Sequence, residues 1–423
     1  MRALPCHLLC SCVAVAMMQA LPSVATEADI DPLSLESAPE ASAEVAANTK
    51  LFIEVTAGNA AQRYLPSSRH FRRASIDFTH ATRLTPTLRG VLSDRIDYTD
   101  PAEADADSTV NSLREAYLSW QPEGGNTVLE LGRINLRYGP AYGYNPTDYF
   151  RDASLRTLTS TNPFAMRENR LGSVMLRAQR LWVGGSMSVA YSPKLEDRPS
   201  AEGWNLDLGA TNNRNRGLVE VSTQFSQRLS SQVLLYKEQD QSASLGASLT
   251  ALLSDAAVAH VEWSNSSEIN PLRRALGEPT TPARRNRLVG GITYTTLGKL
   301  SVTAEYQYNG FGANQQDWDA LASAPQAKWA YLLDAQRRQE QVPRQAMLIY
   351  LTQKSLFLKD LDMTAFLRVN AEDQSRQAWL ELRHHWNKFD LALQWQRYSG
   401  GGASEYGIVP DSRTVQILGN YYF

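Results

Sequence analysis

The residues best suited to chemistry lie close together in one segment, residues 130–151. It begins with the alternation of a strand and breaks at Gly139-Pro140 into a stretch rich in tyrosine, arginine and asparagine. Guanidinium groups form bidentate hydrogen bonds with carboxylates and phosphates, and tyrosine rings fill narrow hydrated spaces at a low cost in conformational entropy. These types indicate a surface that contacts polar or anionic solutes. The candidates are Arg133, Arg137, Tyr138, Tyr142, Tyr144, Asn145, Asp148, Tyr149 and Arg151, joined by Arg177 on a later strand. Within this set, we expect Asp148 to accept backbone N–H bonds or to pair with Arg133, Arg137 or Arg151.

A catalytic site is the alternative that these residue types raise. A nucleophile needs a base within hydrogen-bond reach and a third group to orient that base. Beyond residue 25 the chain has five histidines, and none stands in a metal-binding pair or beside a Gly-x-Ser-x-Gly elbow. The histidines are His70, His80, His260, His384 and His385. We therefore expect no enzymatic activity, no metal site and no cofactor.

The elements that must position the candidates alternate with a period of two. In 299–309, 388–397 and 72–83, apolar residues occupy every second position and polar residues the others. Val302 and Leu393, for example, alternate with Thr303 and Gln394. A strand places such sets on opposite faces, whereas a helix would scatter both around its surface. No stretch beyond the N-terminus approaches the ~18 apolar residues of a transmembrane helix.

The spacing of these segments predicts the architecture. We count about 18 segments, and the connections between them alternate between short ones and mostly long, polar ones. The segments begin near residues 51, 72, 86, 111, 126, 169, 183, 217, 231, 242, 256, 286, 299, 343, 361, 375, 388 and 413. The long connections are 58–71, 99–110, 136–168, 192–216, 265–285, 310–342 and 400–412. This is the topology of bacterial membrane barrels. We predict an all-β, transmembrane, antiparallel up-and-down β-barrel over residues 50–423, with both chain ends in the periplasm.

The N-terminal residues predict export. Arg2, an apolar core from Leu8 to Met18 and the small-x-small site Ser23-Val24-Ala25 mark residues 1–25 as a cleavable signal peptide. The three cysteines all lie within it, and lipidation at Cys12 is the alternative. Residues 26–49 carry six acids and no base and predict a disordered periplasmic tail, a candidate segment for binding a periplasmic partner.

The C-terminal segment carries the most specific local signal. Val415, Ile417, Tyr421 and Phe423 share one face, and Phe423 is the last residue. Here the chain resembles bacterial outer-membrane proteins in general, whose final strand ends in an aromatic residue. The resemblance implies that Tyr421 and Phe423 are read by the barrel-assembly machinery. It also implies a place in the outer membrane, in contact with its lipids and lipopolysaccharide.

A second resemblance rests on the tyrosine- and arginine-rich segment, residues 130–151. A strand with Gly-Arg, an aromatic-Gly pair and then Asn145-Pro146-x-Asp148 followed by an aromatic is similar to a pattern in porin-like and alginate-export-porin-like barrels. This chain has Tyr138 where those families often have Trp. The resemblance implies that loop 136–168 folds inward and narrows a channel. The alternative is that the loop only braces the barrel rim.

The charges leave two interpretations of the lumen open. The formal net charge of −2 does not favour nucleic-acid binding, but 34 of the 42 basic residues are arginine. This excess reflects either a GC-rich genome or arginines that line a pore or bind lipopolysaccharide phosphates. Alternation places nine arginines inside: Arg73, Arg89, Arg95, Arg133, Arg137, Arg177, Arg287, Arg368 and Arg383. The acids expected to face them are Asp77, Asp97, Glu115, Glu220, Glu305, Asp362, Glu381 and Asp390.

These charges could create a field across a pore or form salt bridges that stiffen the wall. Strict counting puts Arg114 and Glu130 on the outer face, so we expect a bulge or a strand end near them. Three functions remain open from the sequence. They are a channel for small polar or anionic solutes, an export conduit for a polymer or lipid-like compound, and a structural or surface-binding barrel.

Overall fold

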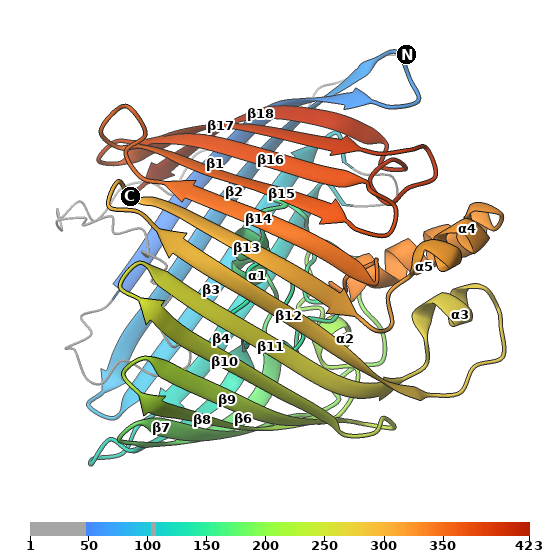
Figure 1. Ribbon diagram of the computed structural model, residues 1–423. Helices are drawn as coiled ribbons and strands as arrows, with labels where there is room; N and C mark the ends of the chain where they lie inside the picture. The colour runs from blue at the N-terminus through green and yellow to red at the C-terminus, as the bar shows by residue number, and fades with distance from the viewer. Residues whose placement is uncertain (1–47, 103–106) are drawn as a thin grey trace, which may run out of the picture. The chain divides into compact units, whose positions relative to one another are not determined.

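The computed structural model describes residues 48–102 and 107–423, which form a closed antiparallel barrel of 18 strands (Figure 1). Each strand pairs with the next one in sequence, and β18 returns to pair with β1, with Phe52 opposite Tyr422. The strands are β1 Asn48–Gln62, β2 Ser68–Thr85, β3 Leu88–Asp100, β4 Thr109–Trp120, β5 Thr127–Ile134, β6 Ser173–Trp182, β7 Gly185–Ser192, β8 Arg216–Ser226, β9 Leu229–Glu238, β10 Ser244–Ser254, β11 Ala257–Glu268, β12 Ala283–Thr295, β13 Leu300–Asn309, β14 Gln345–Gln353, β15 Leu361–Asn370, β16 Arg376–His385, β17 Phe389–Ser399 and β18 Asp411–Tyr422. The predicted fold class is confirmed.

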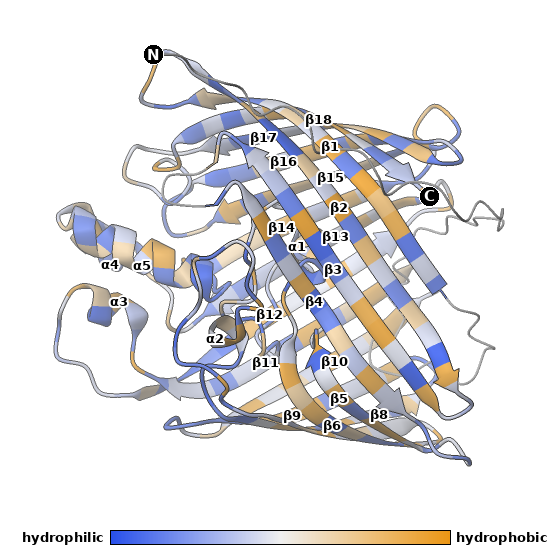
Figure 2. Ribbon diagram, turned by 180° about the vertical axis from the view of Figure 1, so that it is seen from behind, coloured by the Kyte–Doolittle hydropathy of each residue, from blue (hydrophilic) through white to orange (hydrophobic). Residues whose placement is uncertain are grey.

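The period-two alternation places apolar side chains outside and polar side chains inside. Leu393 is 48% exposed on the outer face of β17, while its neighbour Gln394 is 5% exposed inside. Ile76 and Asp77 on β2 are 47% and 5% exposed in the same way. Figure 2 shows the alternating apolar and polar blocks along the strands. The predicted register of these strands is therefore correct, because a slip by one residue would exchange the two faces.

Short turns lie at one end of the barrel and most long connections at the other. Two residues join β2 to β3, β6 to β7, β8 to β9 and β10 to β11. The long connections include 135–172, 193–215, 269–282 and 310–344. The long loop expected at 58–71 is shorter than predicted. β1 ends at Gln62 and β2 begins at Ser68, so residues 63–67 connect them. The signal peptide 1–25 and the tail 26–49, up to residue 47, lie outside the described residues.

Five short helices lie in the long connections of residues 48–102 and 107–423. They are α1 Pro163–Glu168, α2 Leu208–Thr211, α3 Pro271–Ala275, α4 Gln315–Ala322 and α5 Pro325–Arg337. None of the helices among the described residues is long and apolar enough to cross a membrane. In α3 to α5, Leu272, Trp318, Leu321 and Tyr331 form a small apolar cluster beyond the long-loop end of the strands. The period-two alternation of the sequence did not predict these helices.

The wall is lower on one side. β5, β6 and β7 have only 8, 10 and 8 residues, whereas β1 and β2 have 15 and 18. On the long-loop side of these short strands, loop 193–215 forms the rest of the wall and contacts β4 and β6 through side chains and backbone. Asn212 donates to the carbonyl of Val174 at 2.8 Å, and the carbonyl of Gly203 accepts from the amide of Asn111 at 2.8 Å. The chain can therefore leave β5 at mid-height and enter the barrel.

Of the irregularities expected near Arg114 and Glu130, the pairing shows a bulge at Arg114 and a regular strand at Glu130. The pairing of β3 with β4 shifts between Ser93 and Asp94, which leaves Arg114 as the extra residue of a bulge. Arg114 is thereby turned inward, where it pairs with Asp77 at 2.5 Å. Glu130 also faces inward and pairs with Arg177 at 3.0 Å. Counting from the sequence placed both residues on the wrong face.

Candidate functional site

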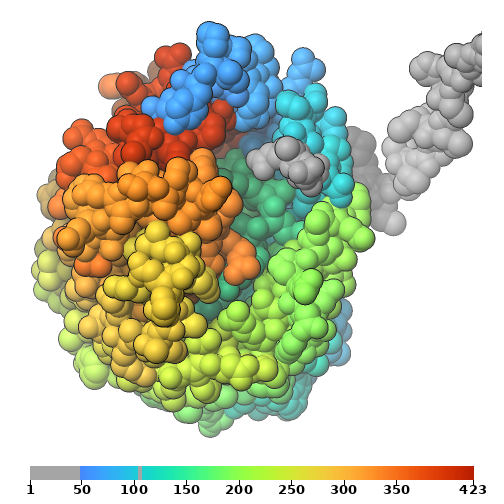
Figure 3. Space-filling model, turned by 90° about the vertical axis from the view of Figure 1, so that its right-hand side faces the viewer, coloured from blue at the N-terminus to red at the C-terminus, as the bar shows by residue number. Residues whose placement is uncertain are grey.

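The connection from β5 to β6, residues 135–172, folds into the barrel. Thr147 and Ser154 are fully buried, and Asp148 is 2% exposed. The connection contacts β3 through Thr157 and β17 through Thr161, two strands that lie four places apart around the barrel. Figure 3 looks onto the long-loop end, and the teal-green atoms of this part of the chain lie at the bottom of the central hollow. The expectation that this loop folds inward is therefore met. We call residues 135–172 the inserted loop.

Glu262 of β11 is the first of two carboxylates that hold the inserted loop. It accepts hydrogen bonds from the amide and the hydroxyl of Thr147, both at 2.8 Å. The side chain of Asn145 and the amide of Ala141 donate to its other oxygen at 3.2 and 3.4 Å. Gly139 has a φ of 93°, and a Cβ there would lie 2.4 Å from both oxygens of Glu262. The Gly139-Pro140 break thus allows the loop to approach this carboxylate closely.

Glu305 of β13 is the second such carboxylate. The amides of Tyr142 and Gly143 donate to it at 2.5 and 3.0 Å. His260 and Gln307 also lie within hydrogen-bond distance, at 3.0 and 2.9 Å. Two lumen carboxylates thus accept four backbone amides of one short stretch, residues 141–147. Hydrogen bonds to charged acceptors are the strong class, so this stretch is fixed in position.

Aromatic rings hold the inserted loop against the remaining walls. Tyr142 packs edge-on against Phe164 at 4.9 Å and Tyr350 of β14 at 5.5 Å between ring centroids. Tyr149 stacks on Tyr236 of β9 at 4.6 Å, and its hydroxyl lies 2.9 Å from that of Ser264. These contacts account for the density of rigid rings in the sequence. They also show that the loop is braced by the wall.

The inserted loop is closed on itself by an internal ion pair. Asp148 pairs with Arg170 at 2.9 Å and approaches Arg167 at 4.0 Å. The sequence predicted that Asp148 accepts backbone N–H bonds or pairs with Arg133, Arg137 or Arg151. That expectation is wrong because the loop doubles back, which brings its two ends together at Asp148.

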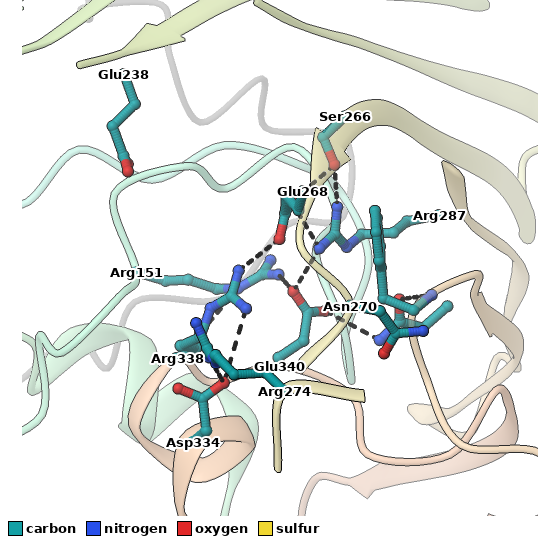
Figure 4. A network of polar contacts seen from close by, with 12 residues as sticks. Arg151, Glu238, Ser266, Glu268, Asn270, Arg274, Arg287, Asp334, Arg338 and Glu340 are labelled. Carbon is teal, nitrogen blue, oxygen red and sulfur yellow. Dashed lines mark hydrogen bonds and ion pairs between the residues drawn. The ribbon is translucent and has the colours of Figure 1, made fainter. Parts of the chain in front are cut away.

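A network of ions ties the inserted loop to the outer loops (Figure 4). Glu340, in the β13–β14 connection, pairs with Arg151 at 3.0 Å and Arg287 at 3.2 Å, and Tyr144 donates to it. Burial alone would raise the pKa of Glu340, but the guanidiniums of Arg287, Arg151 and Arg338 outweigh burial and lower it. The outer loops and the inserted loop are thus joined through one ionised carboxylate.

Eight of the ten predicted site residues divide into three groups, and Arg137 and Arg177 are described with the other arginines below. Tyr142, Tyr144, Asn145, Asp148, Tyr149 and Arg151 all hold the inserted loop in the lumen through the contacts above. Tyr138 is 2% exposed and packs in an apolar cluster with Leu136 and Phe150. Arg133 pairs in the sheet with Ala116 and Val174, and it lies on the same face as the outward-facing Leu131. Its guanidinium donates to the carbonyl of Leu113. The expectation that Arg133 lines the lumen is therefore wrong, because the strand faces inward at even positions here.

Most inward-facing arginines are neutralised by neighbouring acids. Arg95 pairs with Glu54, Asp77 and Asp97 at 2.9–3.3 Å. The other neutralised arginines are Arg73, Arg114, Arg177, Arg287 and Arg383. For these the salt-bridge interpretation holds. Among the described residues, Arg83, Arg89, Arg137 and Arg368 have no carboxylate within 4.0 Å.

Arg83 and Arg89 stand directly opposite each other on β2 and β3, on the inner face at the short-turn end, and both are exposed. Arg137 is half-buried in the inserted loop, and Arg368 donates to Gln307 from the wall of β15. The inward arginines without a salt bridge among the described residues therefore include a pair at one mouth and two beside the inserted loop.

A carboxyl group in the β17–β18 connection predicts a pH effect on the outer loops. Burial, and then Asp373, raise the pKa of Glu405 to about 7, although Arg368 and Asn370 counteract them. Because the folded state then binds this proton more tightly than the unfolded chain, stability falls as the pH rises from the ordinary range of a glutamate through 7. Glu405→Gln should therefore raise the thermal midpoint at pH 8 and leave it nearly unchanged at pH 4. Equal effects of the substitution at both pH values would contradict this assignment.

Several residues that hold the inserted loop were missed from the sequence. Glu262, Tyr236 and Tyr350 lie at inward positions of regular strands, so the alternation could have found them. Glu340 and Arg170 lie in connections, where alternation has no meaning. Only the fold brings them to the loop.

Comparisons with known proteins bear on the fold. No protein-family model matches the chain, and no curated protein matches it. Among solved structures, OccAB1 of Acinetobacter baumannii is similar with a TM-score of 0.57 at 10% identity, covering 89% of this chain and 96% of that one. OccK5 (OpdH) and OpdQ of Pseudomonas aeruginosa each have a TM-score of 0.54 at 9% identity, covering 89% of this chain and 98% and 97% of theirs. At these identities the similarity shows a shared barrel fold.

Proposed function

We propose that this chain is an outer-membrane channel for small polar or anionic solutes, with a bore set by the inserted loop. The observation that carries the proposal is the pinning of residues 141–147 across the lumen by Glu262 and Glu305. A barrel that served only as a scaffold would not need a loop fixed this firmly inside it. The solved barrels that it resembles are outer-membrane porins, which supports the same assignment.

The location and the route to it belong to the same proposal. An outward apolar face, an export signal at residues 1–25 and the terminal Tyr421 and Phe423 are what an outer-membrane barrel requires. Tyr421 and Phe423 are 46% and 60% exposed, with rings 5.1 Å apart, so they are accessible as an assembly signal. The proposal assigns no enzymatic activity and no cofactor to the chain. Export of a polymer or lipid-like compound is the second function proposed from sequence, and a lumen crossed by a pinned loop favours small solutes over it.

The anion preference follows from the arginines that lack acidic partners. Arg83 and Arg89 place two uncompensated charges at the short-turn mouth, where they raise the local concentration of anions. The double variant R83E/R89E should lower the permeability of chloride relative to potassium by about threefold or more, which corresponds to roughly 0.6 kcal/mol, a modest value for exposed charges.

The measurement is the reversal potential of single channels in a planar bilayer under a salt gradient. R180E is a matched control, because Arg180 lies at the same end but faces outward and donates to Thr127. A reversal potential that moves equally in R180E and R83E/R89E would refute a lumen role for the pair. The shift should shrink at high salt, where exposed charges are screened.

A further inference from the structure

Three arginines lie side by side on the outer face of the barrel at its long-loop end. They are Arg376 on β16, Arg397 on β17 and Arg413 on β18, and all three are exposed. Arg397 stands directly opposite Arg413, and Arg376 stands opposite Ser399, two residues from Arg397. Facing residues in such a ladder have Cβ atoms about 5 Å apart and diagonal ones about 7–8 Å. The three guanidiniums can therefore reach one point.

Their direction follows from the alternation of each strand. Arg397 shares its face with Leu393, which is 48% exposed, and Arg413 shares its face with Ile417, which is 54% exposed. Inward positions on the same strands hold Gln394 and Gln377, which are 5% and 8% exposed. The three arginines thus lie on the face proposed to meet lipid, not on the lumen.

The charges of this trio are not neutralised by the protein. Among the described residues, no carboxylate lies within 4.0 Å of any of the three. The nearby Asp411 is occupied by Arg69 at 2.6 Å. Like charges directly opposite each other destabilise a strand pair. Elsewhere on this rim Arg72 stands opposite Asp100, Arg214 pairs with Glu238 and Arg284 donates to Asn265. Among the described residues the trio has no such partner, which leaves it free to bind an external anion.

The trio stands immediately beside the apolar belt. Trp395 and Val415 face each other two residues further toward the membrane centre, followed by Leu393 and Ile417. Two residues of strand correspond to about 7 Å, so the guanidiniums lie at the level of lipid headgroups when Trp395 lies at the interface. On the long-loop side, the anion at that level is a headgroup phosphate.

We propose that Arg376, Arg397 and Arg413 form a binding site for the phosphates of lipopolysaccharide in the outer leaflet. One phosphate placed between Arg397 and Arg413 would accept forked hydrogen bonds from both and remove their repulsion. Arg376 then holds a second oxygen or a second phosphate of the same lipid. The inference rests on the proposed outer-membrane location and not on conduction through the lumen.

The test uses the full chain folded in neutral detergent, to which lipopolysaccharide or enzymatically dephosphorylated lipopolysaccharide is added. The phosphorylated lipid should raise the thermal midpoint of the wild type, and the dephosphorylated lipid should not. R397Q/R413Q should bind the phosphorylated lipid about tenfold or more weakly, because two charge-assisted contacts are lost. In detergent without lipid, the same variant should be at least as stable as the wild type, since the like-charge pair is gone.

The control variant is R72Q, which removes an outward arginine that faces an acid and should leave lipid binding unchanged. If R397Q/R413Q fails to fold, R397K/R413K takes its place, because it keeps the charge, loses the fork and should bind at an intermediate strength. Equal stabilisation by the dephosphorylated lipid, or by inorganic phosphate alone, would overturn the proposal. Channel conductance of R397Q/R413Q should equal that of the wild type, which separates this site from the proposed function.

Discussion

Replacing residues 140–160 with a short Gly-Ser linker is expected to raise single-channel conductance several-fold. The replaced stretch contains Tyr142, Tyr144 and Tyr149, which cross the lumen to contact β14, the outer loops and β9. Without it, current would be limited by the wall of an 18-stranded barrel, which is wide enough to leave an aqueous channel. Conductance in planar bilayers at fixed salt measures the change.

The matched control shortens a different loop. Residues 278–281 lie between α3 and β12 at the long-loop end and are largely exposed, so removing them should leave conductance near the wild-type value. Circular dichroism and the heat-dependent shift in gel mobility show whether each variant is still a folded barrel. An intact barrel whose conductance does not change on loss of residues 140–160 would mean that the inserted loop is not the narrowest part of the path.

Removing the two pinning carboxylates should release the inserted loop without shortening it. In E262A/E305A the amides of Thr147, Tyr142 and Gly143 lose their charged acceptors. Each hydrogen bond to a charged group contributes about 1.5–3 kcal/mol, and about 1.4 kcal/mol is a tenfold change. Amide exchange in residues 141–147 should therefore accelerate at least about hundredfold, and conductance should rise or fluctuate between levels.

Hydrogen–deuterium exchange read by mass spectrometry follows the loop directly. Glu381→Ala is the control, because Glu381 is also an inward carboxylate but pairs with Arg383 and does not contact the loop. It should alter ion selectivity and leave exchange in residues 141–147 at the wild-type rate. Slow exchange retained in E262A/E305A would show that the aromatic contacts alone hold the loop.

The fold was predictable because its signal is repeated along the whole chain. Each strand carries the same alternation, so an error in one strand does not affect the next. Every predicted strand start lies within four residues of the observed one, as β1 at Asn48 and β2 at Ser68 illustrate against predictions near 51 and 72. The missed helices α3 to α5 occur where short apolar stretches lie inside polar connections, and only their packing against one another makes them stable.

The candidate site was predictable in its location and not in its contacts. The tyrosines and the Gly139-Pro140 break identify a special loop, because few local structures require that composition. The contacts between individual side chains depend on the geometry of the barrel, as the pairing of Asp148 with Arg170 shows. Counting every second residue also assigned some side chains to the wrong face of the sheet. The bulge at Arg114 is local backbone geometry that strict alternation does not include. On β5 the alternation is regular, but the inner face is at even positions such as Glu130 and not at Arg133.

The sequence separation of the pinning contacts imposes an order on assembly. Thr147 meets Glu262 across 115 residues, Tyr142 meets Glu305 across 163 and Thr161 meets Gln396 across 235. A loop cannot dock on strands that are not yet in place, and closing such long separations is slow. The inserted loop therefore reaches its seat only when β11, β13 and β17 have paired. The strands that hold the inserted loop consequently pair before the loop docks, and the channel proposed above has its full width until that step.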